Sequence, residues 1–453
     1  MKVHFIAIGG AVMHNLAIAL KLKGYDVSGS DDEIFDPARA NLERYGILPD
    51  QTGWFPERIT PDLDAVILGM HARLGNPELE KATELGLKIY SFPAYIYEQS
   101  KNKKRVVIAG SHGKTTITSL VMHVLKYAGI NFDYLVGAKT RGFDIMVRLS
   151  DAPVIVIEGD EYLTSPLDPR PKFLHYYPNI ALISGIAWDH INVFPDFDQY
   201  VEQFATLVRL IDPDGTLIYS NEDELLKKVV QKEHTRQKLI PYDLPVYSIR
   251  NMVTYLLPDE NKGEAIPLKL FGKHNLLNIS GAQSICRELG VEDELFYAAI
   301  QTFRGADNRL QLLNEQESTT VYKDFAHAPS KLKATVEAVK NQHPDRRLVA
   351  VMELHTFSSL NKGFLQQYAS TMDPAEVPVV YFNPHAIVLK KLPHITMEDV
   401  KEGFANDDMQ VFTDASLLEA FLRKIDYTNT NLLMMSSGNF GGLNVSKLAK
   451  EIV

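Results

Sequence analysis

The chain has 453 residues, of which 45% are hydrophobic and 23% charged, and its formal net charge is -10. This length exceeds what one hydrophobic core usually serves, so roughly two to four globular domains are expected. The negative charge argues against general nucleic-acid binding, and no apolar stretch approaches a membrane span. The single cysteine, Cys286, excludes an internal disulfide, is expected in the core, and fits a cytoplasmic protein.

The first hundred residues alternate short apolar segments with amphipathic ones. Strands are predicted at 3–8, 26–29 and 65–68, with helices near 12–22 and 37–45. This alternation is typical of a parallel, doubly wound sheet. The opening apolar segment is too short for a signal peptide and is expected to be the first strand.

A glycine turn follows the first predicted strand. Gly9 and Gly10 precede a helix, and Asp31 stands at the end of the second strand. Dinucleotide sites use such a turn for a pyrophosphate and an acid for a ribose, but Ala7 and Val12 occupy two of the usual glycine positions. The pattern therefore leaves open a NAD site, a UDP-type diphosphate site, or a turn without a ligand.

The most specific motif follows a basic segment, 101–105, that is expected to be a linker. An apolar strand at 106–109 runs into a short loop and then an apolar helix. The loop reads Gly110-Ser111-His112-Gly113-Lys114-Thr115-Thr116. In a phosphate-binding loop, backbone N–H groups face the phosphates, the lysine adds a positive charge and the threonine hydroxyl reaches Mg²⁺. The spacing is shorter than the common pattern, so a tight strand–helix turn with a surface lysine is the alternative.

Two later strands end in polar residues. Strand 154–157 leads to Glu158 and then to Gly159-Asp160-Glu161, and strand 180–183 leads to Asp189-His190. The carboxyl ends of parallel strands face the ligand crevice, where an acid beside a phosphate loop commonly holds Mg²⁺. Glu158 is therefore either a magnesium ligand or part of a solvated acidic loop. His190 is either a second metal ligand or a structural histidine.

The remaining sequence again predicts an α/β arrangement. In a helix predicted at 275–289, Asn275 and Asn278 share one face, where they would read an adenine or solvate the helix start. Strands are expected at 349–352 and 432–435, with helices between them.

Taken in order, these motifs resemble those of the Mur ligases, the ATP-dependent amide-forming ligases of peptidoglycan synthesis. The resemblance covers essentially the whole chain and rests on Gly9-Gly10, Ser30-Asp31, the loop at 110–116, Glu158–Glu161, Asp189-His190, Lys273–Asn278, Arg309 and Asp324–Pro329. It implies three α/β domains: a Rossmann-like UDP-sugar domain at 1–103, a central P-loop ATP-binding domain at 104–311, and a Rossmann-like domain at 312–453 for the incoming amine or peptide.

The resemblance also implies roles for individual residues. The ATP-binding set would be Gly110, Ser111, His112, Gly113, Lys114, Thr115, Thr116, His274, Asn275, Asn278, Arg309 and Asp324. The UDP-sugar set would be Gly9, Gly10, Ser30, Asp31, His71 and Arg73. The catalytic set would be Lys114, Glu158, His190, Arg309 and His327, with Thr115, Glu158 and His190 as magnesium ligands.

The reaction implied is amide formation on the lactyl carboxylate of UDP-N-acetylmuramate through an acyl phosphate. The amine would be the tripeptide L-Ala-γ-D-Glu-meso-diaminopimelate, as in peptidoglycan recycling, or L-alanine, as in synthesis. Segments 160–162, 168–176, 325–327 and 436–442 resemble the tripeptide branch more closely. The segment Glu353–Ser359 departs from both branches, which usually carry an arginine there.

Two other functions remain open at this point: a nucleotide-binding regulator without catalysis, and a NAD-dependent dehydrogenase that uses the first domain. The partners expected are small molecules, without nucleic acid or membrane, and the chain is expected to be a monomer or a weak homodimer.

Overall fold

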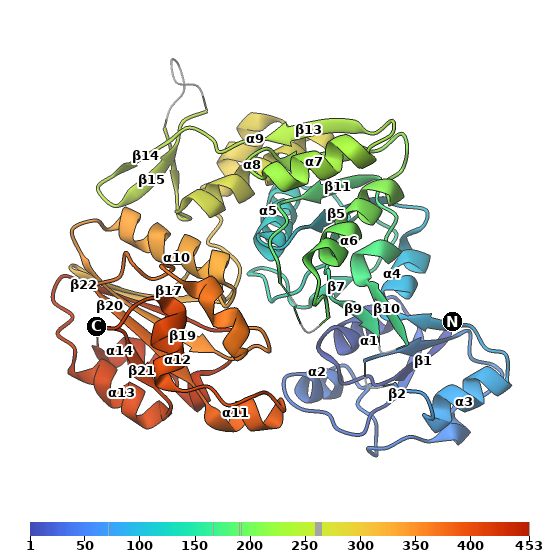
Figure 1. Cartoon of the computed structure of the whole chain (residues 1–453). Coiled ribbons are helices and arrows are strands. Elements are labelled where there is room, and N and C mark those ends of the chain that lie inside the picture. The colour runs from blue at the N-terminus through green and yellow to red at the C-terminus, as the bar shows by residue number, and fades with distance from the viewer. Residues whose placement is uncertain (71, 166, 190, 192, 259–264, 453) are drawn as a thin grey trace. The chain divides into compact units, whose positions relative to one another are not determined.

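The computed structural model describes residues 1–70, 72–165, 167–189, 191, 193–258 and 265–452 (Figure 1). Two predicted site residues, His71 and His190, lie outside the described residues. The chain divides into two compact units, each described by itself below. The first holds Met1–Ile186, Asp198–Tyr242 and Gly281–Ala299, and the second holds Ala187–Phe197, Asp243–Ser280 and Ile300–Val453.

The first unit begins with a four-stranded parallel sheet in the order β2-β1-β3-β4. Its strands are β1 (Lys2–Ile6), β2 (Asp26–Ser30), β3 (Ala65–Leu68) and β4 (Ile89–Ser91). Its helices are α1 (Ala11–Leu22), α2 (Ala38–Arg44), η1 (Pro56–Arg58), α3 (Pro77–Glu84) and α4 (Phe92–Ser100). The predicted alternation of strands and helices is thus confirmed, and Phe5, Leu16 and Ile67 are fully buried in the core.

The rest of the first unit is built on a seven-stranded sheet in the order β13-β12-β11-β5-β8-β6-β7. Its strands are β5 (Lys104–Ala109), β6 (Phe132–Leu135), β7 (Val147–Arg148), β8 (Val154–Glu158), β11 (Ile180–Ile183), β12 (Thr216–Ser220) and β13 (Lys238–Tyr242). All neighbours pair in parallel except the edge strand β7, which is antiparallel to β6. The central strand β5 is buried on both faces, as its apolar residues predict.

The elements around this sheet are mostly helices. They are α5 (Lys114–Tyr127), α6 (Phe197–Leu210), α7 (Glu224–Glu233), α9 (Asp293–Ile300) and the part of α8 (Lys273–Glu288) from Gly281 onward; the first half of α8 belongs to the second unit. A small hairpin, β9 (Leu163–Ser165) with β10 (Asp168–Pro171), precedes η2 (Lys172–His175). Cys286 is fully buried, as expected, and burial raises the pKa of its thiol.

The basic segment 101–105 is not all linker. Lys104 and Arg105 already belong to β5, and Arg105 is buried. Lys103 is also fixed, because its ammonium lies 2.6 Å from the carboxylate of Asp133. A run of positive charges resembles a solvated connector in the sequence, but tertiary partners fix most of it here.

The second unit contains a six-stranded sheet in the order β17-β18-β22-β19-β20-β21. Its strands are β17 (Gln311–Gln316), β18 (Thr319–Asp324), β19 (Arg347–Leu354), β20 (Val377–Phe382), β21 (Gln410–Phe412) and β22 (Thr430–Met435). Only the edge pair β17–β18 is antiparallel. The strands predicted at 349–352 and 432–435 are confirmed as parts of β19 and β22.

Helices surround this sheet. They are α10 (Pro329–Gln342), η3 (Lys362–Tyr368), α11 (Pro384–Leu389), α12 (Met397–Phe404), α13 (Ala415–Lys424), η4 (Phe440–Gly442) and α14 (Val445–Ile452). A separate antiparallel sheet consists of β14 (Tyr247–Arg250), β15 (Val253–Leu256) and β16 (Ile266–Leu268).

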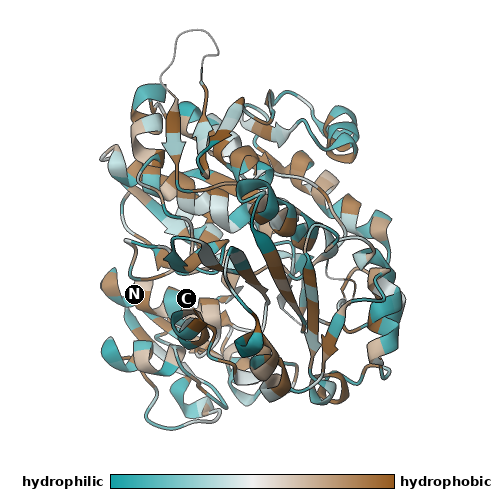
Figure 2. Ribbon diagram, turned by 90° about the vertical axis from the view of Figure 1, so that its left-hand side faces the viewer, coloured by the Kyte–Doolittle hydropathy of each residue, from teal (hydrophilic) through white to brown (hydrophobic). Residues whose placement is uncertain are grey.

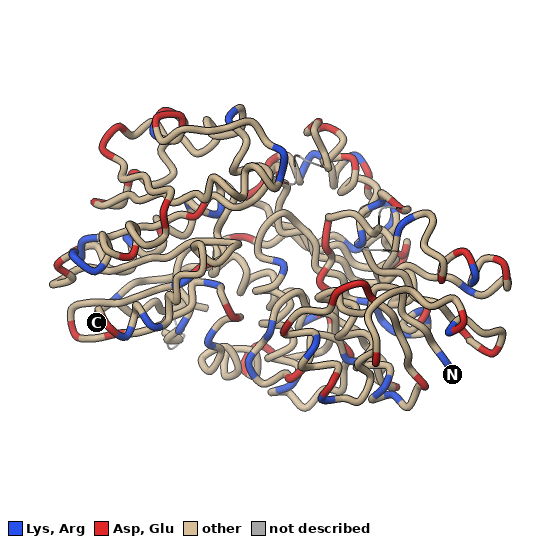
Figure 3. Tube along the Cα trace, turned by 90° about the horizontal axis from the view of Figure 1, so that it is seen from below, with Lys and Arg blue, Asp and Glu red and all other residues tan. Residues whose placement is uncertain are grey.

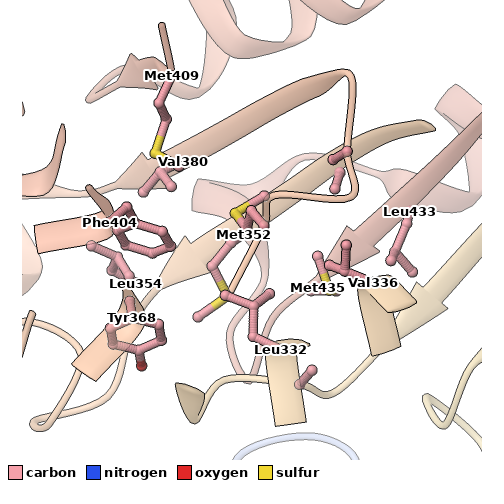
Figure 4. Packing of buried hydrophobic residues seen from close by; sticks show 14 of the residues in the cluster. Leu332, Val336, Met352, Leu354, Tyr368, Val380, Phe404, Met409, Leu433 and Met435 are labelled. Atoms are coloured by element: carbon pink, nitrogen blue, oxygen red, sulfur yellow. The ribbon is translucent and has the colours of Figure 1, made fainter. Parts of the chain in front are cut away.

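Alternate residues of the C-terminal strands enter two different cores. Met352 and Met435 pack with Leu332 and Val336 of α10 in one core, which Figure 4 shows from close by. Val351, between two residues of that first core, belongs to the other. A strand alternates its side chains between two faces, so a continuous apolar segment such as 348–352 indicates a sheet covered on both sides. The brown, hydrophobic strands within a more mixed exterior are visible in Figure 2.

No described helix of the structure is both long and apolar enough to span a membrane. Lysine and arginine residues are interspersed with aspartate and glutamate over the described chain, as Figure 3 shows. The net negative charge is therefore not collected in one extended acidic segment.

Candidate active site

The predicted phosphate loop lies between β5 and α5 and depends on two glycines in the left-handed region. Gly110 has φ +123°, and Gly113, at the start of α5, has φ +78°. A Cβ atom on Gly110 would lie 2.2 Å from the hydroxyl oxygen of Ser184, so no larger residue fits there. The Ser184 hydroxyl in turn donates to the carbonyl oxygen of His112. The loop is therefore fixed by the segment that directly follows β11.

Lys114 starts α5 and is held by two oxygen acceptors. Its ammonium donates to the Gly110 carbonyl oxygen at 2.7 Å and lies 2.6 Å from a carboxylate oxygen of Glu161. Burial alone would lower the pKa of Lys114, but the charges of Glu161 and Asp160 outweigh it, and the pKa is raised. Lys114 is therefore a fixed positive charge at the loop. The sequence did not predict the role of Glu161, because the pairing depends on the path of the chain after β8.

Glu158, the last residue of β8, forms a hydrogen bond with Thr115, the residue after Lys114. The Thr115 hydroxyl donates to one Glu158 oxygen at 2.7 Å, and the backbone N–H of Gly137 donates to the other at 2.7 Å. A Cβ atom on Gly137 would lie 2.8 Å from the carboxylate, so glycine makes room for it. A hydroxyl and a carboxylate oxygen at this spacing form the hard-oxygen donor pair that suits Mg²⁺.

A second ion pair stands beside Lys114. The carboxylate of Asp160 lies 2.6 Å from the ammonium of Lys172 in η2. Burial would raise the pKa of Asp160, but the positive charges of Lys172 and Lys114 lower it to about 2. Positive and negative groups thus alternate around the loop, and an incoming polyphosphate would have to compete with carboxylates for Lys114.

The glycine turn of the N-terminal sheet borders a cavity of about 690 Å³. Gly9, Gly10 and Arg73, all in the predicted UDP-sugar set, line it. Ser30 is fully buried, and Asp31 is 1% exposed. The two Asp31 oxygens accept from the backbone N–H groups of Gly9 at 2.7 Å and Asp32 at 3.0 Å, so this acid supports the turn. That Ser30 and Asp31 contact the ligand stays a prediction.

The lining also includes residues that sequence reasoning missed. His14, Phe35 and Trp54 border the cavity, and burial lowers the pKa of His14. Aromatic faces suit a nucleobase. Phe35 and Trp54 stand outside the helices and strands, where no periodic pattern marks them.

In the second unit, the acid at the end of β18 is bound by backbone groups. Asp324 accepts from the N–H of Leu310 at 2.5 Å and from that of Ala326 at 2.7 Å. His274 lies within its electrostatic reach: burial lowers the pKa of His274, while the charge of Asp324 raises it in part. Asn275 is buried, and its side chain donates to the Phe271 carbonyl oxygen at 2.9 Å.

The loop after β18 contains two more predicted residues. The Arg309 guanidinium lies over the Phe325 ring, 4.6 Å from its centroid. His327 lies 3.9 Å from a carboxylate oxygen of Asp189, which also accepts from the Lys331 ammonium at 3.1 Å. The sequence pointed to Asp189 and His327 separately, but it did not predict Lys331 as their neighbour.

The unusual segment after β19 also has a structural role. Glu353 is 2% exposed, and one of its oxygens accepts from the Ser436 hydroxyl and, at 2.8 Å, from the Phe440 N–H. It thereby ties the loop after β22 to the end of β19, beside Asp324. Gly438 stands so close that a Cβ atom would lie 2.8 Å from both Glu353 and His355.

The predicted residues thus fall into three described groups. One group joins the loop at 110–116 to Glu158, including Ser111, whose hydroxyl is 2.8 Å from that of Tyr200. Another joins Arg309, Asp324 and His327 at the end of β18. The third borders the N-terminal cavity. Asn278 is buried in α8, and its contact with adenine stays a prediction.

Comparisons with known proteins agree with this arrangement. Three family models match the chain: "Mur ligase family, catalytic domain" at residues 2–104, "Mur ligase middle domain" at 108–286, and "Mur ligase, glutamate ligase domain" at 308–438. The chain belongs to the Mur ligase family. Its three-domain α/β architecture is confirmed, whereas the exact boundaries at 103 and 311 stay predictions.

Three relatives are representative. A UDP-N-acetylmuramate–L-alanyl-γ-D-glutamyl-meso-2,6-diaminoheptandioate ligase from Haemophilus influenzae is 28% identical over 99% of this chain and 98% of its own length. A UDP-N-acetylmuramate–L-alanine ligase from Caldanaerobacter subterraneus is 30% identical over 84% of this chain and 82% of its own length. The crystal structure of a murein peptide ligase from Psychrobacter arcticus matches with a TM-score of 0.67 at 24% identity, covering 100% of this chain and 99% of that one, and it shows the shared fold.

Proposed function

We propose that this Mur ligase is an ATP-dependent enzyme that joins UDP-N-acetylmuramate to the tripeptide L-Ala-γ-D-Glu-meso-diaminopimelate. It would act in the cytoplasm, where ATP and UDP-N-acetylmuramate would be supplied. The observation that carries the proposal is the phosphate loop, where Lys114, Thr115 and Glu158 stand together. The full-length similarity to a ligase of this name supports the substrates.

The chemistry follows from this arrangement. The muramate carboxylate attacks the γ-phosphorus of ATP, ADP leaves, and an acyl phosphate forms. The amine then attacks the acyl carbon through a tetrahedral intermediate, phosphate leaves, and the amide remains. Such transfers depend on positioning and charge neutralisation more than on a covalent nucleophile.

The residues have separate tasks in this scheme. Lys114 would exchange Glu161 for the transferring phosphate and neutralise the charge that develops there. Thr115 and Glu158 would hold Mg²⁺, which supplies further charge neutralisation for the phosphates. Phe35, Trp54 and Arg73 would bind the UDP portion in the N-terminal cavity, and His327 would border the path of the amine.

The alternative substrate is L-alanine, because the L-alanine ligase from Caldanaerobacter subterraneus has the higher identity over a shorter span. The test is ADP release by purified protein with Mg-ATP and UDP-N-acetylmuramate, with the tripeptide or L-alanine added in separate reactions. Release with the tripeptide alone supports the proposal, and release with L-alanine alone replaces it by the alternative. Release with neither would leave a nucleotide-binding regulator.

A further inference from the structure

A buried arginine joins two parts of the first unit. Arg105, the second residue of β5, is 8% exposed. Its Nη1 donates to the carbonyl oxygens of Ser100, Lys101 and Lys103, each at 3.0 Å. Its Nε donates to those of Tyr176 at 3.0 Å and Tyr177 at 2.9 Å. One guanidinium therefore contacts the end of α4, next to the N-terminal sheet, and the segment that follows η2, next to the central sheet.

These five acceptors are uncharged backbone oxygens, which is an unusual environment for a buried cation. Ser100 and Lys101 end α4, where the carbonyl groups without a partner inside the helix carry the negative end of the helix dipole. Arg105 therefore completes the hydrogen bonding of that helix end from outside the helix. The planar, five-donor guanidinium suits this arrangement, which a lysine ammonium with three donors would satisfy only in part.

Two tyrosines extend the same contact. The Tyr97 ring of α4 lies 5.0 Å from the Tyr177 ring, and the Arg105 guanidinium stands over Tyr97 at 5.4 Å. Tyr177 has φ +42°, a conformation that costs free energy for a residue with a side chain, and its carbonyl oxygen faces Arg105. A strained backbone conformation is kept only where surrounding contacts hold it, so the contacts of Tyr177 with Arg105 and Tyr97 hold this segment in one conformation.

The position of Arg105 along the chain connects it to the site. β5 ends at Ala109, and Gly110, five residues after Arg105, begins the phosphate loop. The other residues it binds follow η2, whose Lys172 pairs with Asp160 beside Lys114. In a second contact, the Met146 N–H donates to the side-chain oxygen of Asn15 in α1 at 3.0 Å, which ties the same two sheets together next to His14 of the cavity.

We infer that Arg105 is a positioning residue: it fixes the orientation of the N-terminal sheet and its cavity relative to the sheet that bears the phosphate loop. Given the proposed function, the muramate carboxylate must reach the γ-phosphate from that cavity. A change of about 1 Å in such a placement costs up to roughly 100-fold in rate. Arg105 would thus govern the reaction without touching a substrate.

A matched control is available in Arg346. It is 7% exposed, and it too is held by uncharged groups, namely the Thr320 hydroxyl at 2.9 Å, the Asn431 side-chain oxygen at 3.3 Å and the Glu317 carbonyl oxygen at 2.9 Å. These partners all lie within the C-terminal sheet region. Arg346→Met should therefore lower stability as Arg105→Met does, without affecting the N-terminal sheet.

The first measurement does not depend on the reaction. Spin labels on Glu80→Cys in α3 and Lys228→Cys in α7 would report the distance between the two parts, and Cys286 is fully buried and remains unlabelled. In Arg105→Met the distance distribution should broaden, in Arg105→Lys it should broaden less, and in Arg346→Met it should match the parent. An unchanged distribution in Arg105→Met, or equal broadening in Arg346→Met, would overturn the inference.

Kinetics provide the second measurement. Arg105→Met should lower kcat/KM for UDP-N-acetylmuramate by about 10- to 100-fold while the dissociation constant for ATP stays the same, because the loop itself is intact. Equal weakening of ATP binding would indicate general damage and contradict a positioning role. Should the parent enzyme release no ADP, the proposed function fails, whereas the spin-label comparison still decides whether Arg105 sets the orientation.

Discussion

Glu158 and Asp324 are each the last residue of a largely buried strand, β8 and β18, yet their surroundings differ. Glu158 accepts from one backbone N–H and from the Thr115 hydroxyl of the phosphate loop. Asp324 accepts from two backbone N–H groups at 2.5 and 2.7 Å, and only distantly, at 3.4 Å, from the Thr335 hydroxyl of α10. A carboxylate that faces a loop hydroxyl can exchange it for a cation, whereas one that bonds two N–H groups mainly holds the chain in place. The position of an acid at a strand end therefore does not by itself show whether it binds a metal ion or holds the backbone in place.

The largest effect is expected from removing the positive charge of Lys114 at the phosphate loop, the loop that Glu158 faces. Lys114→Met should lower ADP release by at least about 100-fold, because the ammonium that would neutralise the transferring phosphate is lost. It also leaves Glu161, 1% exposed, without that cation, so thermal stability should fall. The double variant with Glu161→Gln is the control: it should recover the melting temperature but not the activity. Near-parental turnover in Lys114→Met would remove the lysine from the mechanism.

Glu158→Gln tests the acid that faces the loop. The amide keeps an acceptor for Thr115 but loses the charge that attracts Mg²⁺, so turnover should fall by about 10- to 100-fold and the Mg²⁺ concentration for half-maximal rate should rise. A Mg²⁺ titration of ADP release measures both. If the variant saturates at the same Mg²⁺ concentration as the parent, Glu158 is not a metal ligand.

Asp324→Asn should lower stability but leave nucleotide binding nearly unchanged, in contrast to Glu158→Gln. An amide offers one oxygen, so the N–H of Leu310 or of Ala326 loses its acceptor, and the free energy of unfolding should fall by about 1–3 kcal/mol. ATP affinity, measured well below the melting temperature, should stay within about threefold. A large loss of ATP affinity at unchanged stability would instead support the sequence-based assignment of Asp324 to the nucleotide.

The same contrast explains what the sequence could predict. The phosphate loop was found because its glycines, lysine and threonines lie within a few residues of each other and of an apolar strand. The sheet strands could be predicted because continuous apolar segments of the sequence indicate buried strands. The Lys114–Glu161 pair, the support that Asp31 gives to Gly9, and the cavity positions of Phe35 and Trp54 depend on how distant segments meet. Patterns within a short stretch of sequence do not indicate which distant segments come into contact, so only the structure shows these features.

The smallest effect concerns a histidine that supports the fold. His343, 3.0 Å from the Tyr322 hydroxyl, has its pKa lowered from 6.5 to about 4 by burial and by the charge of Arg346. Between these values the unfolded chain binds a proton that the folded chain does not, so His343 makes stability fall as the pH drops from 6.5 towards 4. His343→Gln should therefore lose less stability over this interval, which urea denaturation at several pH values would measure. Carboxylates that titrate in the same range are common to both proteins and cancel in the difference, so parallel stability profiles would show that His343 does not remain neutral in the folded state.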